Sequence, residues 1–275
     1  MGTSHRHKAG PIGSPNWGKS SAAVSSIANT EKADEQLQQY PSTGIPQEVV
    51  DRKRVIYTRR INTQYHNAIR YLVRAAGGRA SVSSGRSRAV GRAGVVWATG
   101  LAQAFHEIAE QGLVTWLNRK GYSFGGPHDC RETLNIIEGF VAEYFVGMDG
   151  TAASEALEHV MDKVEQLAEG QSEKLDEILQ KIISEDEIKD LIDDFFGIYI
   201  YSHLSQNFKE KLEKDKGVEI AAKTMDEIKE LILDDVHRGI SGRPASRVDW
   251  RGIEGEQFIK DEFNRIILIL TNNED

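Results

Sequence analysis

The sequence predicts an all-α fold: a bundle-like body of several helices, preceded by a long flexible arm rich in glycine and proline. Apolar residues recur at helical spacing through most of the chain. Two Ser/Thr-x-x-Glu patterns, Ser184 with Glu187 and Thr224 with Glu227, have the spacing of a capping box at a helix start. Alternating strand patterns are nearly absent, and residues 198–201 are too few to change the prediction.

Composition narrows the class of protein. The 275 residues include 39% hydrophobic and 28% charged residues, as in an ordinary globular protein. The single cysteine, Cys130, excludes an internal disulfide framework and fits a reducing compartment. No segment has the roughly 18 to 20 apolar residues that cross a bilayer, and the first residues lack the apolar core of a signal peptide. We therefore expect a cytoplasmic protein that does not bind membranes.

Charge is distributed unevenly along the chain. Residues 1–100 carry 15 Lys and Arg against 5 Asp and Glu, whereas residues 132–275 carry 16 against 34. No acidic residue lies between Arg52 and His106. Such asymmetry indicates either that the two parts attract each other or that the basic part has an anionic partner. The sequence does not decide between them.

Residues 1–46 are predicted to be the flexible arm. Glycine and proline interrupt every potential helix in the first twenty residues, and only Ile12 and Trp17 there could enter a core. Residues 20–40 have the composition of a short polar helix, which the segment 41–46, with a proline at each end, terminates.

Residues 47–147 are predicted to be a basic-to-neutral helical region. Between residues 57 and 76, apolar side chains fall on one helical face, and Arg59, Arg70 and Arg74 fall on the other. The pattern then predicts a glycine-rich loop at 77–85, a helix at about 89–117, a turn at 121–127 and a helix that begins at 128 or 129.

Residues 148–275 are predicted to be an acidic helical region, either separate from residues 47–147 or continuous with them. Thr151 and Ser172 are expected helix caps, in addition to the two capping boxes. A loop covers residues 239–249, and apolar residues at helical spacing from Phe258 to Leu270 predict a last helix.

Residues 13–20, Gly-Ser-Pro-Asn-Trp-Gly-Lys-Ser, match the phosphate-loop pattern letter by letter. That chemistry requires the loop to lie between a buried strand and a helix, so that backbone amides cradle the phosphates. No strand pattern precedes these residues, so we expect no bound nucleotide and no other cofactor.

Histidine and cysteine patterns also have simple structural explanations. His106, Glu107 and Glu110 resemble half of a zinc-protease helix, but glutamate replaces the second histidine, and a polar helix face explains them. Cys130 lies close to His128, yet neighbours on a helix point in different directions, and a lone cysteine near a helix start is usually a small core residue. We predict no catalytic residue and no metal site. A metal enzyme that uses His106 and Glu110 is the third-ranked alternative.

The arginine-rich stretch 52–92 is a stronger candidate for function. Ten of its eleven basic residues are arginine, which forms paired hydrogen bonds with phosphate or carboxylate. Tyr57, Tyr65 and Tyr71 are interleaved with them, as in surfaces that bind nucleic acid. Arg59, Arg70 and Arg74 are the candidate anion-binding residues. The alternative is that this surface docks on an acidic partner or on the chain's own acidic half.

The start of the sequence resembles the B components of the bacterial Qat anti-phage defence systems. The resemblance covers about twenty residues: Met1-Gly-Thr-Ser4, then a ribbon with Gly10-Pro11 and Gly13-Ser-Pro-Asn-Trp17. His5, Arg6, His7 and Lys8 depart from it, since small polar residues are expected there. Gly2 is small enough for removal of the initiator methionine, and its amine would then be nucleophilic near neutral pH. Arg6 occupies the position where a myristoylation motif requires serine or threonine.

The resemblance implies a non-enzymatic subunit whose arm is a protein substrate. In these systems the B component is encoded beside a QueC-like enzyme, an ATPase and a TatD-like nuclease. The QueC-like partner is expected to conjugate a 7-deazaguanine base to Gly2, with Thr3, Ser4, Gly10, Pro11, Gly13 and Trp17 forming the arm that it recognises. The alternative function is a nucleic-acid-binding or sensing subunit that works through residues 52–92.

Overall fold

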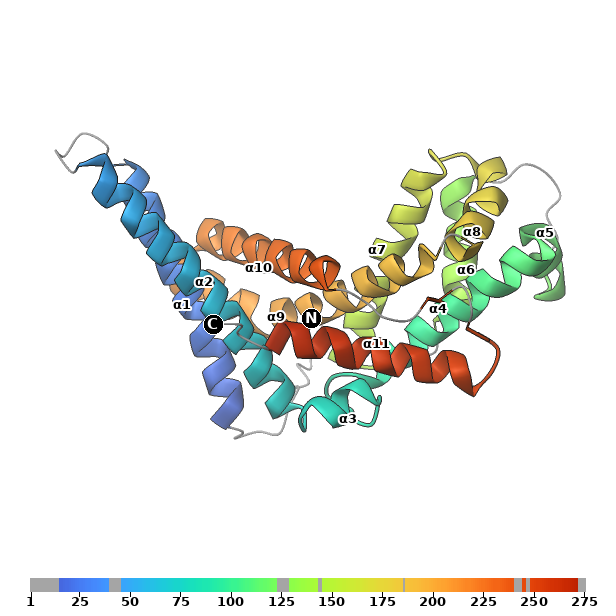
Figure 1. Cartoon of the computed structure of the whole chain (residues 1–275), viewed down its shortest axis with the longest axis horizontal. Helices are drawn as coiled ribbons and strands as arrows, with labels where there is room; N and C mark the ends of the chain where they lie inside the picture. The colour runs from blue at the N-terminus through green and yellow to red at the C-terminus, as the bar shows by residue number, and fades with distance from the viewer. Residues whose placement is uncertain are drawn as a thin grey trace, which may run out of the picture.

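The computed structural model describes residues 15–39, 46–122, 129–142, 145–184, 186–239, 244–245 and 248–271. These residues form helices and contain no strand, which confirms the predicted all-α fold (Figure 1). None of the described helices has the length and apolar composition needed to span a bilayer. In chain order they are α1 (Pro15–Gln39), α2 (Gln47–Ala75), α3 (Arg79–Ser83), α4 (Arg92–Gln111), α5 (Leu113–Arg119), α6 (Cys130–Val141), α7 (Met148–Leu167), the 3-10 helix η1 (Ser172–Lys174), α8 (Leu175–Ser184), α9 (Ile188–Lys216), α10 (Val218–Arg238) and α11 (Ile253–Thr271).

Helix α9 forms the centre of the molecule and packs most extensively against α7 and α10. Its first half buries side chains on every face, among them Phe195, Phe196 and Tyr199. A helix that is apolar all round has to be surrounded by other elements, and α1, α2, α4 and α11 also contact α9. One hydrophobic cluster extends from α1 to α11, so the predicted regions 47–147 and 148–275 share a single core.

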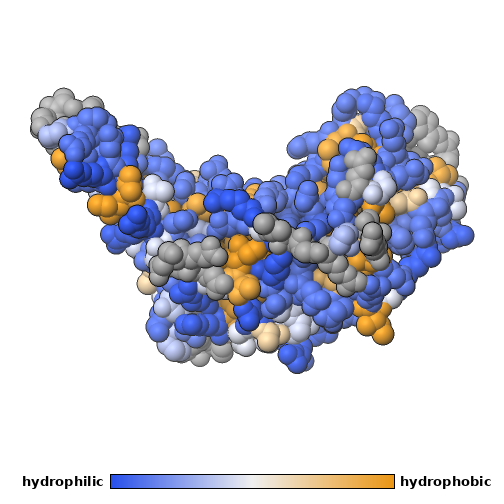
Figure 2. Space-filling model, in the orientation of Figure 1, coloured by the Kyte–Doolittle hydropathy of each residue, from blue (hydrophilic) through white to orange (hydrophobic). Residues whose placement is uncertain are grey.

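Two groups of helices project from this centre (Figure 1). Helices α1 and α2 pair as an antiparallel hairpin that leaves the body on one side, while α6, α7 and α8 rise on the other side and α10 lies between them. The outer part of the hairpin extends beyond the core, because every residue from 51 to 56 is exposed. The face shown in Figure 2 is mainly hydrophilic, with small apolar patches, and one of these patches lies on the hairpin.

Helix α1 corrects the predicted arm of residues 1–46. Residues 15–39 form a helix, and Val24 and Ile27 of this helix are fully buried against α2. Proline is tolerated in the first turn of a helix, and the alanines and serines that follow let α1 approach α2 closely. Residues 1–14 and 40–45 lie outside the described residues.

Several predicted helix ends also differ from the structure. Thr224 lies inside α10 and donates a hydrogen bond to the Ile220 carbonyl oxygen (2.7 Å), so it caps no helix. Ser184 ends α8, and α9 begins only at Ile188. Thr151 lies within α7, and the predicted loop at 77–85 contains α3. The predicted helix 89–117 is divided into α4 and α5 at Gly112, whose φ of 83° suits glycine.

Candidate functional site

The part of the predicted recognition arm that the structure describes is held by the body. The Trp17 ring is half-buried and lies 5.5 Å from the Phe208 ring of α9. The buried Ser20 hydroxyl donates to the Ala68 carbonyl oxygen of α2 (2.7 Å). Trp17 therefore anchors α1 to the body, and its predicted role in partner recognition stays a prediction. The other predicted arm residues, Gly2, Thr3, Ser4, Gly10, Pro11 and Gly13, lie outside the described residues.

The segment that matches the phosphate-loop pattern forms no such loop where it is described. Residues 15–20 are helical, and the Lys19 ammonium lies 5.4 Å from the centre of the Tyr71 ring. With the Ser20 hydroxyl bonded to a carbonyl oxygen, neither side chain occupies the position that a phosphate site requires. Residues 15–20 are instead part of a helix that packs on α2.

The three candidate anion-binding arginines have different surroundings. Arg70 donates from Nε (3.0 Å) and Nη2 (2.8 Å) to the Thr271 carbonyl oxygen, so it caps the C-terminal end of α11. Arg70 thus has a structural role in the described residues, and its predicted anion binding stays a prediction. Arg59 and Arg74 are exposed on α2, and neither forms an ion pair with an acidic residue that the structure describes. The Arg74 guanidinium lies 5.8 Å from the Tyr71 ring.

Residues 52–92 contact the acidic half of the chain through the packing of α2 and α3 on α11 and through Arg70, but no described Lys or Arg side chain of this stretch forms an ion pair with an acidic residue there. Within residues 52–92, the ion pair that the structure describes for a Lys or Arg side chain joins Arg52 to Glu48 of the same helix. Of the interleaved tyrosines, Tyr65 is fully buried and belongs to the core, whereas Tyr57 and Tyr71 are half-buried.

A buried polar cluster around Asp149 connects α4, α7 and α9. Asp149 accepts hydrogen bonds from the backbone N–H groups of Gly91 (3.1 Å) and Ala93 (2.8 Å), from the Tyr199 hydroxyl, and from His203 Nε2 (3.2 Å). The carboxylate thus caps the N-terminal end of α4 from another helix. Burial by itself raises the pKa of Asp149. The hydrogen bond and charge interaction with His203, with the hydrogen bonds from Ala93 and Tyr199, outweigh burial and lower this pKa below its usual value. Burial and the adjacent carboxylate raise the pKa of Tyr199 well above its usual value.

A second buried cluster joins α9 to α11. Arg265 Nη2 lies 2.6 Å from both carboxylate oxygens of Asp193, and its Nε donates to Glu262 Oε1 (2.6 Å). Two carboxylates therefore share one guanidinium. Burial and the charge of Glu262 together outweigh Arg265 and raise the pKa of Asp193 to about 8.

The neighbouring Asp194 makes a third cluster, which reaches the surface. Its side chain is buried, and it forms ion pairs with Lys163 of α7 and with His237 Nε2 of α10 (2.8 Å). His237 is 45% exposed and Lys163 is 37% exposed, so the cluster opens to solvent between these helices. Nothing in the sequence predicts the three clusters, because their members lie tens of residues apart.

The residues of the enzyme alternative are also described. His106 Nε2 lies 3.4 Å from Glu110 Oε1, and Glu110 forms a further ion pair with Arg251. Burial and Arg251 lower the pKa of His106, whose Nδ1 atom has no hydrogen-bond partner. Among the described residues, no three His, Cys, Asp or Glu side chains are grouped so that they could hold a metal ion. Cys130 is buried at the start of α6, as predicted for a core residue, and burial raises its pKa.

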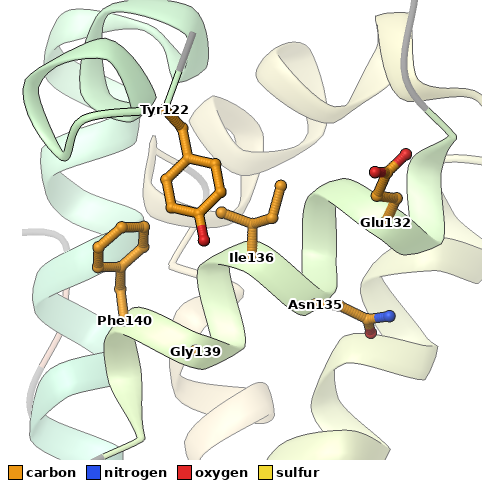
Figure 3. Close-up of a pocket in the computed structure, with 6 residues that line it drawn as sticks. All are labelled: Tyr122, Glu132, Asn135, Ile136, Gly139 and Phe140. Carbon is orange, nitrogen blue, oxygen red and sulfur yellow. The ribbon is translucent and has the colours of Figure 1, made fainter. Parts of the chain in front are cut away.

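A shallow pocket of about 300 Å³ lies on α6 (Figure 3). The rings of Tyr122 and Phe140 meet edge to face at one end, 5.5 Å apart, with Ile136 beside them. Trp116 contacts Phe140 in the same way, at 5.4 Å. Glu132, Asn135 and Gly139 complete the lining. The pocket offers aromatic edges to a ligand, and it contains no residue that the sequence singled out.

No protein-family model, curated protein or solved structure matches this chain.

Proposed function

We propose that this protein is a non-enzymatic subunit of a cytoplasmic anti-phage defence complex, whose N-terminal residues are presented to a partner enzyme and modified by it. The observation that carries the proposal is the fixed position of α1. Trp17 packs on α9 and Ser20 bonds to α2, so the start of α1 is held at one place on the body. A body that fixes the start of a substrate segment can place it in the active site of a docked enzyme.

The resemblance of residues 1–17 to the B components of Qat systems supplies the partner and the chemistry. The partner is the QueC-like enzyme, and the modified atom is the amine of Gly2, exposed when Met1 is removed. In the step that we propose, a carboxylate on the 7-deazaguanine base attacks the α-phosphate of ATP, which forms an acyl adenylate and releases pyrophosphate. The Gly2 amine attacks the acyl carbon, an amide bond forms, the amine loses a proton, and AMP departs.

The geometry limits where the partner docks. Twelve residues separate Gly2 from Pro15, so the chain from Gly2 to Pro15 spans at most about 45 Å. The active site of the enzyme must therefore lie within that distance of the start of α1. Thr3 and Ser4 have small side chains, which would let the backbone enter a narrow site.

The mass of the N-terminal peptide tests the modification. The protein would be purified from cells that carry the neighbouring genes and from cells that lack the gene for the QueC-like enzyme. We expect an added mass on Gly2 only in the first cells, and its loss in Gly2→Pro, whose ring nitrogen is a poor substitute for a primary amine. Gly18→Ala is the matched control: Gly18 is exposed on α1, has no atom within 4 Å of an added Cβ, and should leave the added mass unchanged. An unmodified Gly2 in both cells would contradict the proposal.

A further inference from the structure

We propose that the exposed basic side chains of α2, α3, the segment between α3 and α4, and the first residue of α4 bind the phosphate backbone of nucleic acid. This arginine surface is independent of the modification of Gly2. It consists of Lys53, Arg54, Arg59, Arg60, Arg74, Arg79, Arg86, Arg88 and Arg92, all of which are exposed.

The charges of the arginine surface are not neutralised within the described residues. None of its nine members pairs there with an acidic side chain; Arg60 and Arg86 donate only to the hydroxyl groups of Ser26 and Ser84. Elsewhere in the described residues, basic side chains do form ion pairs with acidic ones, as Lys223 does with Glu31 (2.8 Å). Like charges held together without counter-charges repel one another and attract a polyanion.

The spacing of the arginines on α2 suits an extended ligand. Arg59 and Arg74 are 15 residues apart, close to four helical turns, so they lie on the same face about 22 Å from each other. This face belongs to the hairpin that projects from the body (Figure 1). Arg79 lies on α3, Arg86 and Arg88 lie between α3 and α4, and Arg92 begins α4, so the basic surface continues beyond the end of α2.

Tyr71 adds an aromatic ring to this surface. The half-buried ring has two exposed cations near it, with Lys19 of α1 at 5.4 Å and Arg74 at 5.8 Å from its centre. A ring with cations near it combines the two contacts that single-stranded nucleic acid uses, stacking of a base and pairing of its phosphates. Lys19 also places this site beside the start of α1.

The extent of the arginine surface favours nucleic acid over an acidic protein. A protein partner would be expected to cover the apolar patch on the outer hairpin, where Val55 and Ile56 are each 61% exposed. The site at Tyr71 lies 15 residues further along α2, about 22 Å from Ile56, and Arg79 and Arg88 lie beyond it. Nine cations spread over such a length match the evenly spaced phosphates of a nucleic-acid backbone better than they match one compact acidic patch on a protein.

Binding to labelled oligonucleotides tests the proposal. A single strand of about 20 nucleotides and a duplex of the same length would be titrated at about 50 to 200 mM salt. We expect binding that weakens as salt rises, and a loss of about tenfold or more in Arg59→Gln/Arg74→Gln, with the salt slope reduced by about 2. Tyr71→Leu should weaken the single strand more than the duplex, because only unpaired bases stack on the ring.

A matched variant separates local contacts from net charge. Lys209→Gln/Lys214→Gln removes the same charge from exposed positions of α9, in the acidic half, and should leave binding unchanged. Absence of binding at low salt would overturn the proposal, as would equal weakening by the two double variants. If the wild-type protein binds no oligonucleotide but binds an acidic protein, and Val55→Ser/Ile56→Ser abolishes that protein binding, the hairpin is a protein-docking surface instead.

Discussion

At the scale of single residues, Asp149 has the largest structural role that the sequence does not reveal. One carboxylate satisfies two backbone N–H groups at the start of α4, a buried hydroxyl and a buried imidazole. The backbone at this point also demands glycine: the φ of Gly91 is 122°, and a Cβ there would lie 2.2 Å from the Val82 carbonyl oxygen.

Replacement of Asp149 should therefore be costly. In Asp149→Ala, buried donors lose their acceptor, and we expect the free energy of unfolding to fall by about 3 to 5 kcal/mol. Urea denaturation at neutral pH measures this loss. Asp215→Ala, at an exposed position of α9, is the control and should change stability little. Equal denaturation midpoints for the two variants would contradict the role assigned to Asp149.

The sequence correctly predicted those structural features that depend only on residue composition and spacing. Cys130 was predicted to be a small core residue, and it is buried. The partners of Asp149 were not predictable, because Gly91 is 58 residues away and His203 is 54 residues away. The structural role of Arg70 was not predictable for a similar reason, since its acceptor, the Thr271 carbonyl oxygen, is 201 residues distant.

At the scale of helices, the contact between α9 and α11 makes stability depend on pH. The folded protein holds a proton on Asp193 up to a pKa of about 8, whereas the unfolded chain releases it near 3.9. The contribution of Asp193 to the free energy of unfolding is therefore complete below about pH 4 and is lost as pH rises toward 8. In this range the free energy of unfolding falls by at most about 1.4 kcal/mol per pH unit because of this group.

Thermal unfolding of Asp193→Asn between about pH 5 and 9 measures this dependence. Asparagine keeps an acceptor for Arg265 and cannot ionise, so we expect the variant to gain stability relative to the wild type as pH rises. His66, His106 and His159 have pKa values lowered first of all by burial, so they act in the opposite direction below about pH 6.5. Their effect is common to both proteins and cancels in the difference. A difference that does not change with pH would contradict the protonation of Asp193.

The helices themselves were largely predictable, and their ends were not. Apolar periodicity located the bodies of α2, α7 and α11 because each buries one face. Thr224 shows why the capping boxes misled: a threonine followed by glutamate at the third position also occurs inside a helix, where the hydroxyl bonds to the preceding turn. The breaks occur instead at Gly112 and Gly217, whose φ values are positive.

At the scale of the whole molecule, the charge is separated along the chain, and most basic side chains of residues 52–92 are exposed on the hairpin and around α3. Within the described residues these side chains form no ion pairs with the acidic helices, and an anionic partner for them stays a prediction. The packing of α1 was missed, because its small residues look polar in sequence and become a core face only against α2.

The central claim is that the helical body presents the N-terminal residues to the enzyme that modifies them. The most direct test compares the full protein with a synthetic peptide of residues 2–20 as substrates of the purified QueC-like enzyme, its 7-deazaguanine base and ATP. Docking of the body raises the effective concentration of Gly2 at the active site, so we predict that kcat/KM for the full protein exceeds that for the peptide by about 100-fold or more. Equal values for the two substrates would contradict the claim.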